Sequence, residues 1–145
     1  MKYVLIISLF FLFCCQYTNQ QQDLQDIKSV LSAQAEAWNK GDIEDYMAGY
    51  QESDSLRFAS GGNVSYGWET TMNRYKKGYP DIATMGTLVF SDIDIRIISD
   101  DAALVFGKWE LERDADHPWG LFTLLFRKTD KGWRIVHDHT SSANN

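Results

Sequence analysis

Apolar residues in the first part of the chain recur at the three- and four-residue steps of an α-helix. The apolar stripe consists of Leu24, Ile27, Leu31, Ala35 and Trp38. We expect this helix to end at Lys40-Gly41, because glycine tolerates the left-handed conformation that often follows a helix. Asp42 should then cap a short second helix, since its side chain can accept backbone N–H bonds. A third helix is expected over Trp68–Lys77.

Strand patterns dominate the rest of the chain. Two short strands, Ser55–Ala59 and Asn63–Tyr66, are expected on either side of a glycine-rich turn. Beyond the third helix, the sequence predicts longer strands at Thr87–Ile98, Ala102–Arg113, Trp119–Lys128 and Trp133–Ser141. Helices that precede a meander of long antiparallel strands indicate a single domain of the α+β class.

Alternation along the strand Ala102–Arg113 predicts which side chains face the helices. Gly107, Trp109 and Leu111 lie on one side, which we expect to be the inner side of the domain. Lys108 and the glutamates that follow it lie on the other side, facing water or a partner.

The N-terminus has the pattern of a targeting segment. Lys2 precedes the almost wholly apolar run Tyr3–Phe13, which is shorter than the ~20 residues that span a bilayer but typical of a signal peptide. The run ends in Cys14 and Cys15, and Leu12-Phe13-Cys14-Cys15 resembles a bacterial lipoprotein signal with Cys15 as the lipidated residue. An ordinary secretory signal is the alternative.

Three segments follow from this interpretation. Residues 1–15 are predicted to be the signal peptide, residues 16–22 a polar tether too poor in apolar residues to fold, and residues 23–143 the domain. The protein should be exported, as a periplasmic or outer-membrane lipoprotein or otherwise as a secreted protein. It would then meet the membrane only through a lipid anchor.

Charge narrows the choice of partners. The net charge of −6 and the pI near 4.9 argue against nucleic acid or an anionic membrane surface as the main partner. The short basic run Arg74-Tyr75-Lys76-Lys77 is interpreted as the solvated face of the third helix.

The order of elements and five stretches resemble the nuclear-transport-factor-2-like superfamily, and within it the uncharacterised SnoaL-like members. The stretches are Asn39-Lys40-Gly41-Asp42, Gly67-Trp68-Glu69 leading to Tyr79-Pro80, Met85-Gly86-Thr87, Phe122–Lys128 and Gly132–Ser141. The resemblance implies a cone of three N-terminal helices packed in a strongly bent antiparallel sheet, with an interior pocket. It says little about function, because such cones host both enzymes and non-catalytic assembly domains.

Two more distant relatives can be compared position by position. Ketosteroid isomerases use a pair of carboxylic acids, whose positions would fall near Phe58 and near Leu124 or Leu125 in this chain, so that pair is absent. The association domain of calcium/calmodulin-dependent kinase has pocket arginines, which would fall at Trp109, Leu124 and Thr140. An anionic ligand held by that cluster is therefore not expected, and the pocket should be mainly aromatic and aliphatic.

Two histidines on the last strand suggest a metal site at first sight. His137 and His139 are two residues apart and point the same way, but a zinc site needs a third ligand and His117 lies beyond the far end of the neighbouring strand. We therefore predict no metal and no cofactor. The resemblance to the kinase association domain implies that Asp138 and Thr140 face the pocket while the histidines face solvent or a second subunit. A bulge in the strand could reverse this assignment, so His139 remains a candidate ligand-binding residue.

Asp138 is the main candidate for chemistry. A carboxylate on the inner face of an aromatic cone would be desolvated, which raises its pKa and suits it to acid–base catalysis or to orienting a ligand. The alternative is that it only bonds tyrosine or tryptophan donors and fixes the core. The candidate ligand-binding residues are Trp38, Tyr46, Tyr50, Trp68, Tyr75, Trp109, Thr140 and His139, and Trp119 is one more aromatic residue that could reach the pocket.

The leading functional hypothesis is an exported domain that binds a small apolar or aromatic molecule in the cone, with Asp138 as its polar centre. One alternative is a non-catalytic assembly module that forms a homodimer through the outer face of the sheet, including Leu104 and Phe106. Another is an enzyme of the isomerase, dehydratase or cyclase type that uses Asp138.

Overall fold

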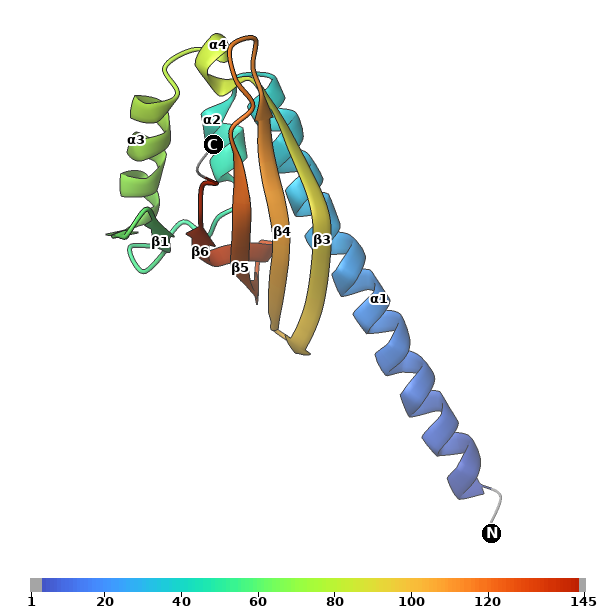
Figure 1. The fold of residues 1–145 in the computed structure, drawn as a ribbon. Helices are drawn as coiled ribbons and strands as arrows, with labels where there is room; N and C mark the ends of the chain where they lie inside the picture. Colours follow the sequence, from blue (N-terminus) through green and yellow to red (C-terminus); the bar gives the residue numbers. More distant parts are fainter. Residues whose placement is uncertain (1–3, 144–145) are drawn as a thin grey trace.

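The computed structural model describes residues 4–143, and the side chains of residues 19–143. The predicted α+β cone is confirmed, and its elements are arranged as Figure 1 shows. In chain order they are α1 (Val4–Asn39), α2 (Ile43–Met47), β1 (Arg57–Ser60), β2 (Asn63–Tyr66), α3 (Trp68–Gly78), α4 (Ile82–Met85), β3 (Thr87–Ser99), β4 (Ala102–Glu112), β5 (Trp119–Thr129) and β6 (Gly132–Thr140).

The strands form one sheet in the order β2-β1-β6-β5-β4-β3. Hairpins join β1 to β2, β3 to β4, β4 to β5 and β5 to β6, so these pairs are antiparallel. The pair β1–β6 is parallel, where the sequence predicts an antiparallel sheet throughout. Its direction differs because no hairpin joins these two strands, so no tight turn sets their relative direction. The helix α1 packs against β3 and β6, and α3 contacts β2 and α2 (Figure 1).

The first helix is anchored to the last hairpin through a buried carboxylate. Asp23 accepts hydrogen bonds from Lys128 Nζ at 2.6 Å and from Trp133 Nε1 at 3.0 Å, and it is 6% exposed. The backbone of α1 is also helical over residues 16–22, where the sequence predicts a polar tether. The predicted signal peptide, residues 1–15, lies outside the residues whose side chains are described. None of the described helices combines the length and the hydropathy of a bilayer-spanning segment.

The short helices begin at capping carboxylates. Asp42 caps α2 as predicted, because its side chain accepts the backbone N–H of Asp45 at 2.9 Å. In the same way Asp81 caps α4 by accepting the N–H of Thr84 at 2.7 Å. The sequence reading missed α4, since four residues are too few to show a helical period.

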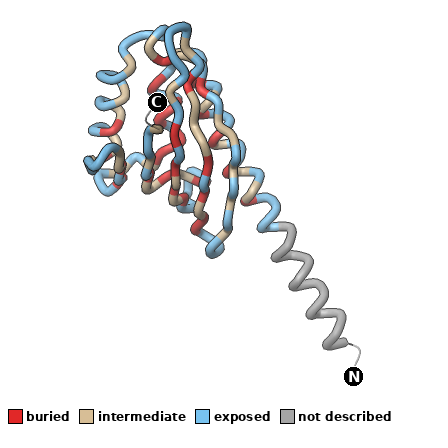
Figure 2. The backbone as a smooth tube through the Cα atoms, in the orientation of Figure 1, coloured by how far each residue is buried: buried red, intermediate tan, exposed pale blue. Residues whose placement is uncertain are grey.

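A single core fills the space between α1, α2 and the concave face of the sheet. Buried and less buried residues alternate along the long strands, as Figure 2 shows. On β4 the predicted assignment of faces is confirmed: Ala103, Val105 and Leu111 are buried, whereas Phe106 on the opposite face is 42% exposed. The largest fully buried side chains are Trp133, Phe126, Ile27, Met47, Leu56 and Ile135.

The described sheet has three register shifts, and two of them change which side chains point inward near the cavity. On β3, Asp92 and Ile93 both lie opposite Gly107, and Asp92 has a positive φ of 54°. On β6, Ile135 pairs with Phe126 and His137 pairs with Leu125, so the residue between them, Val136, has no partner on β5. An extra residue reverses the alternation beyond it, because successive side chains of a strand point to opposite faces.

Glycine at position 107 is required by packing opposite the β3 bulge. A Cβ there would lie 2.5 Å from Cζ of Phe122 and 2.6 Å from Cδ1 of Ile93. We therefore expect Gly107→Ala to lower the free energy of unfolding by about 1–3 kcal/mol in urea titrations. Gly78→Ala is the matched control, since its Cβ would meet nothing within 4 Å, and it should leave stability unchanged or slightly higher. Equal effects of the two substitutions would contradict this explanation.

Candidate functional site

The concave side of the sheet and the first three helices enclose a cavity of about 430 Å³. This volume is within the range of small-molecule sites, roughly 300–1,000 Å³. Its walls are largely aromatic: Trp38, Tyr46, Tyr50, Phe58, Tyr75, Tyr79, Phe90, Trp109 and Phe122. Three side chains that can be charged near neutral pH also line it: two arginines, Arg74 and Arg113, and one acid, Asp138.

Most of the residues predicted from the sequence line this cavity. They are Trp38, Tyr46, Tyr50, Tyr75, Trp109, Asp138 and Thr140. Trp68 does not, because its indole lies against α2 and donates to the carbonyl of Met47 at 2.9 Å. Trp119 does not either: it is 37% exposed on the outer face, where Lys108 Nζ lies 4.9 Å from the ring centroid.

His139 is the remaining predicted ligand-binding residue that lies outside the cavity, and it is exposed. The bulge at Val136 explains this placement. Upstream of it Trp133 and Ile135 point inward, and downstream Asp138 points inward, so both histidines are on the outer face. There Arg57 Nε donates to Nδ1 of His137 at 2.8 Å, and burial together with the Arg57 charge lowers the pKa of His137.

Within the described part of the chain, no three histidine, cysteine, aspartate or glutamate side chains gather as they would around a metal ion. Because of the bulge at Val136, the inner face of β6 presents the carboxyl group of Asp138 to the cavity rather than the two imidazoles.

Asp138 is a buried carboxyl with one bonded and one unbonded oxygen. It is 5% exposed, and Tyr50 donates its hydroxyl proton to Oδ2 at 2.8 Å. Oδ1 is buried and has no hydrogen-bond partner among the described residues. Burial raises the pKa of Asp138 to about 7, although the Tyr50 hydrogen bond and the positive charge of Arg74 act in the opposite direction. At neutral pH the group is therefore available both as an acid and as a base.

Three tyrosine hydroxyls form a triangle that is linked to this carboxyl through Tyr50. The oxygen of Tyr46 lies 3.5 Å from that of Tyr50 and 3.4 Å from that of Tyr75, and the last two are 3.4 Å apart. Burial, reinforced by the nearby Asp138 carboxylate, raises the pKa of Tyr46 to about 12 and holds the pKa values of Tyr50 and Tyr75 well above their ordinary range. The phenols thus stay protonated, and Asp138 is the member of the cluster that titrates near neutral pH.

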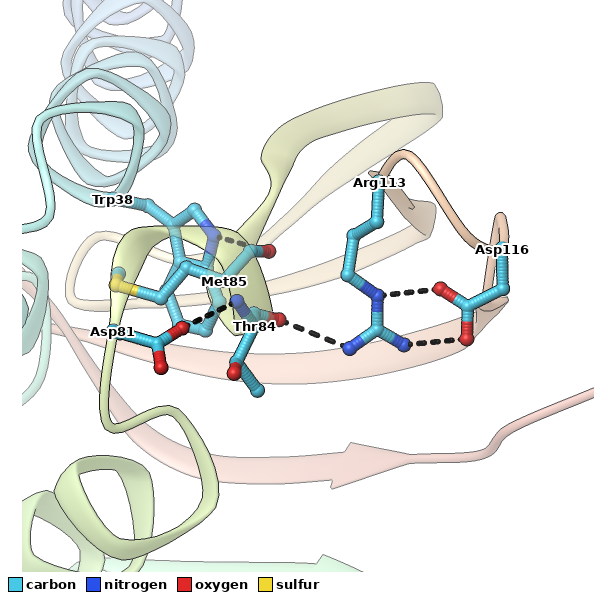
Figure 3. Close-up of polar contacts among 6 residues, drawn as sticks. All are labelled: Trp38, Asp81, Thr84, Met85, Arg113 and Asp116. Carbon is cyan, nitrogen blue, oxygen red and sulfur yellow. Dashed lines mark hydrogen bonds and ion pairs between the residues drawn. The ribbon is translucent and has the colours of Figure 1, made fainter.

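Figure 3 shows the polar contacts that hold the rim of the cavity next to α4. Trp38 Nε1 donates to the carbonyl of Met85 at 3.2 Å, which ties α1 to the end of α4. Arg113 donates to the carbonyl of Thr84 at 2.9 Å and to both carboxylate oxygens of Asp116 at 2.7 and 3.1 Å. The Arg113 guanidinium is therefore already paired, and it joins α4 to the loop after β4.

The sequence reading missed several lining residues. Phe122 could have been found, because it alternates with the inward Leu124 on β5. Arg74 could not, since it lies off the apolar stripe of α3 and reads as solvated. In the structure Arg74 is exposed, as that pattern predicts, and it also lines the cavity, with its guanidinium carbon 4.9 Å from the ring centroid of Phe58.

Comparisons with known proteins identify the same fold. Residues 27–145 match the family model of the SnoaL-like domain. A crystal structure of an NTF-2 like protein of unknown function from Shewanella oneidensis MR-1 is 44% identical, over 81% of this chain and 98% of that one, with a TM-score of 0.78. No curated protein matches the chain.

Two less similar structures share the fold alone. A ketosteroid isomerase-like protein from Erwinia carotovora atroseptica SCRI1043 is 20% identical over 85% of this chain and 98% of that one, with a TM-score of 0.67. A nuclear transport factor 2 (NTF2-like) superfamily protein from Salmonella enterica serovar Typhimurium LT2 is 19% identical over 87% and 94%, with a TM-score of 0.68.

The raised pKa of Asp138 predicts a pH-dependent stability. Between the ordinary value of 3.8 and about 7, the unfolded chain loses the proton while the folded chain keeps it, so this group destabilises the fold increasingly as pH rises. Each tenfold change in proton affinity corresponds to about 1.4 kcal/mol, so the full effect above pH 7 is on the order of 4 kcal/mol.

Asp138→Asn removes this titration and should stabilise the protein. We expect its advantage over the native protein in urea unfolding to grow by roughly 3 kcal/mol between pH 5 and pH 8. Titration of other groups cancels in this comparison because both proteins carry them. An advantage that does not change with pH would show that Asp138 is not the buried titrating group.

The Tyr50 hydrogen bond favours the charged form of Asp138, so Tyr50→Phe should raise the pKa of this carboxyl above about 7. The pKa can be measured by following the carboxyl carbon resonance of Asp138 by NMR across pH. Tyr46→Phe is the matched control, since its hydroxyl is bonded to the other tyrosines rather than to Asp138. A pKa that falls or stays unchanged in Tyr50→Phe would contradict the assigned role.

Proposed function

Because the chain belongs to the SnoaL-like domain family, we propose that its cone binds a small apolar or aromatic molecule and orients it through one polar contact with Asp138. The observation that carries this proposal is Oδ1 of Asp138, a buried oxygen without a hydrogen-bond partner among the described residues, on the wall of an aromatic cavity. A buried polar atom left unpaired destabilises a protein by roughly 1–3 kcal/mol, so a ligand that pairs with it gains affinity.

The chemistry of the walls defines the ligand further. Flat aromatic faces such as those of Trp109 and Phe122 favour rings and apolar bodies. Asp138 accepts from a ligand hydroxyl or amine when ionised, and donates to a carbonyl when protonated. Its partner on the ligand is therefore a single polar group held deep among aromatic side chains.

An enzyme of the isomerase, dehydratase or cyclase type is the second candidate, and it is favoured by the pKa of Asp138 near 7. The pair of carboxylic acids that ketosteroid isomerases use is absent from this chain. The corresponding positions fall near Phe58 and near Leu124 or Leu125, and Phe58 and Leu124 lie directly opposite Asp138 in the sheet. Any proton transfer would then rely on one central carboxyl supported by Tyr50 rather than on a separated pair.

The outer face of the sheet supports a homodimer as an additional proposal. Val89, Phe106 and Leu121 are exposed there by 40%, 42% and 42%. Phe106 and Leu121 lie near each other on β4 and β5, whereas Lys108 and Glu110 separate them from Val89. Apolar residues exposed together on a sheet face are typical of a subunit contact. This contact is compatible with ligand binding on the opposite, concave face.

Export with a lipid anchor at Cys15 also remains part of the proposal, on the basis of the N-terminal sequence.

Ligand binding can be tested by thermal unfolding with a panel of neutral aromatic ketones and alcohols, such as acetophenone, 1-indanone and 2-naphthol. A ligand at a hundred times its Kd stabilises the folded protein by about 2.7 kcal/mol, which raises Tm by several degrees. We expect such shifts for the native protein and their loss in Asp138→Asn and Trp109→Ala.

Trp119→Ala is the matched control, because this exposed tryptophan lies outside the cavity and its removal should leave the ligand-induced shift intact. The same shift in Asp138→Asn as in the native protein would contradict the proposed polar contact. A panel without any shift in the native protein would contradict the binding proposal itself.

A further inference from the structure

The cavity is more positive than the protein as a whole. The chain carries a net charge of −6. Three side chains of the cavity wall can be charged near neutral pH, and two of them are arginines. The third, Asp138, is partly protonated at neutral pH. A guanidinium group at a binding cavity favours an anion there by local charge, provided that no carboxylate already neutralises it.

The two arginines differ in what they already bind. Arg113 is paired with both carboxylate oxygens of Asp116 and with the carbonyl of Thr84. Arg74 makes no hydrogen bond or ion pair with any side chain of residues 19–143, and its one specific contact is the face of Phe58. Its guanidinium N–H groups are therefore available to a ligand.

Arg74 also lines the same cavity as Asp138. It lies over Phe58, which pairs with Asp138 across the β1–β6 strands. Arg74, Asp138 and Tyr79 all line the same cavity, and the positive charge of Arg74 acts to lower the pKa values of the other two. The next inward residues on these strands, Ser60 and Thr140, are paired with each other and line the same wall.

From this arrangement we infer that the ligand of the cavity is an aromatic carboxylate, which pairs its acid group with Arg74 and presents a carbonyl or hydroxyl to Asp138. The inference rests on the proposed binding function and names the class of ligand. A guanidinium matches a carboxylate with two parallel hydrogen bonds, and the Phe58 ring supports its flat face. A dianion such as a phosphate ester is less well matched, because the second guanidinium is already neutralised by Asp116.

The test compares aryl keto acids with their methyl esters, which have the same shape without the charge. Benzoylformate, 3-benzoylpropionate and 4-benzoylbutyrate cover three separations between ketone and carboxylate. By isothermal titration calorimetry at pH 7, at least one acid should bind several-fold more tightly than its ester, as expected for an ion pair with an exposed arginine.

Substitutions assign this preference to one side chain. Arg74→Gln should remove the preference for the acid and leave ester binding unchanged, and Arg74→Lys should restore part of it because the charge returns without the guanidinium fork. Lys77→Gln is the matched control, since Lys77 is an exposed cation on the same helix outside the cavity lining, and it should change neither affinity.

The outcomes separate this inference from the proposed function. Esters that bind as well as the acids, or an acid preference that survives in Arg74→Gln, would overturn the inference and leave the binding proposal standing. An acid preference lost equally in Lys77→Gln would also overturn it, because it would reflect general charge rather than Arg74. Failure of every acid and every ester to bind would overturn both.

Discussion

One residue of β6, Val136, has no cross-strand partner on β5, and this bulge determines which side chains of the strand face the cavity. Before Val136, the inward side chains of β6 are Trp133 and Ile135, which belong to the core. Beyond it the alternation is reversed, so Asp138 points inward and the neighbouring histidines point outward. A regular strand that kept its tryptophan in the core would have put imidazoles in the cavity. The bulge therefore lets one strand supply both hydrophobic packing and a buried carboxyl group.

The buried carboxyl group of Asp138 destabilises the fold, and the residues around it set its pKa. Its neighbours across the sheet, Phe58 and Leu124, are apolar, and Tyr50 supplies its one hydrogen bond. Burial outweighs that bond and the more distant charge of Arg74, so its pKa rises to about 7. Proteins retain destabilising groups of this kind mainly where function requires them. A residue that served only to fix the core would be expected to have both oxygens bonded.

The success of sequence reasoning varied with the range of the interactions involved. Local patterns located the first three helices, the capping role of Asp42 and all six strands, because these depend on nearby residues. The helix α4 was missed, since a single turn has no period to detect. The inward position of Asp138 came from a resemblance to relatives rather than from alternation alone, which a bulge can reverse. Arg74 was assigned to solvent, and it is exposed, but its position on the cavity wall over Phe58 depends on packing between α3 and a strand distant in the sequence.

The sequence by itself determined the class of fold, the apolar character of the inner surface and the presence of one aspartate among aromatic residues. These properties follow from composition and from periods of two and of three to four residues, which short-range geometry sets. Only the tertiary structure decided that β1 pairs with β6 in parallel, that Oδ1 of Asp138 is left without a partner among the described residues, and that Arg74 lines the same cavity. The physical reason is that strand pairing, bulges and sheet curvature join residues distant in the chain, and no local pattern encodes those contacts.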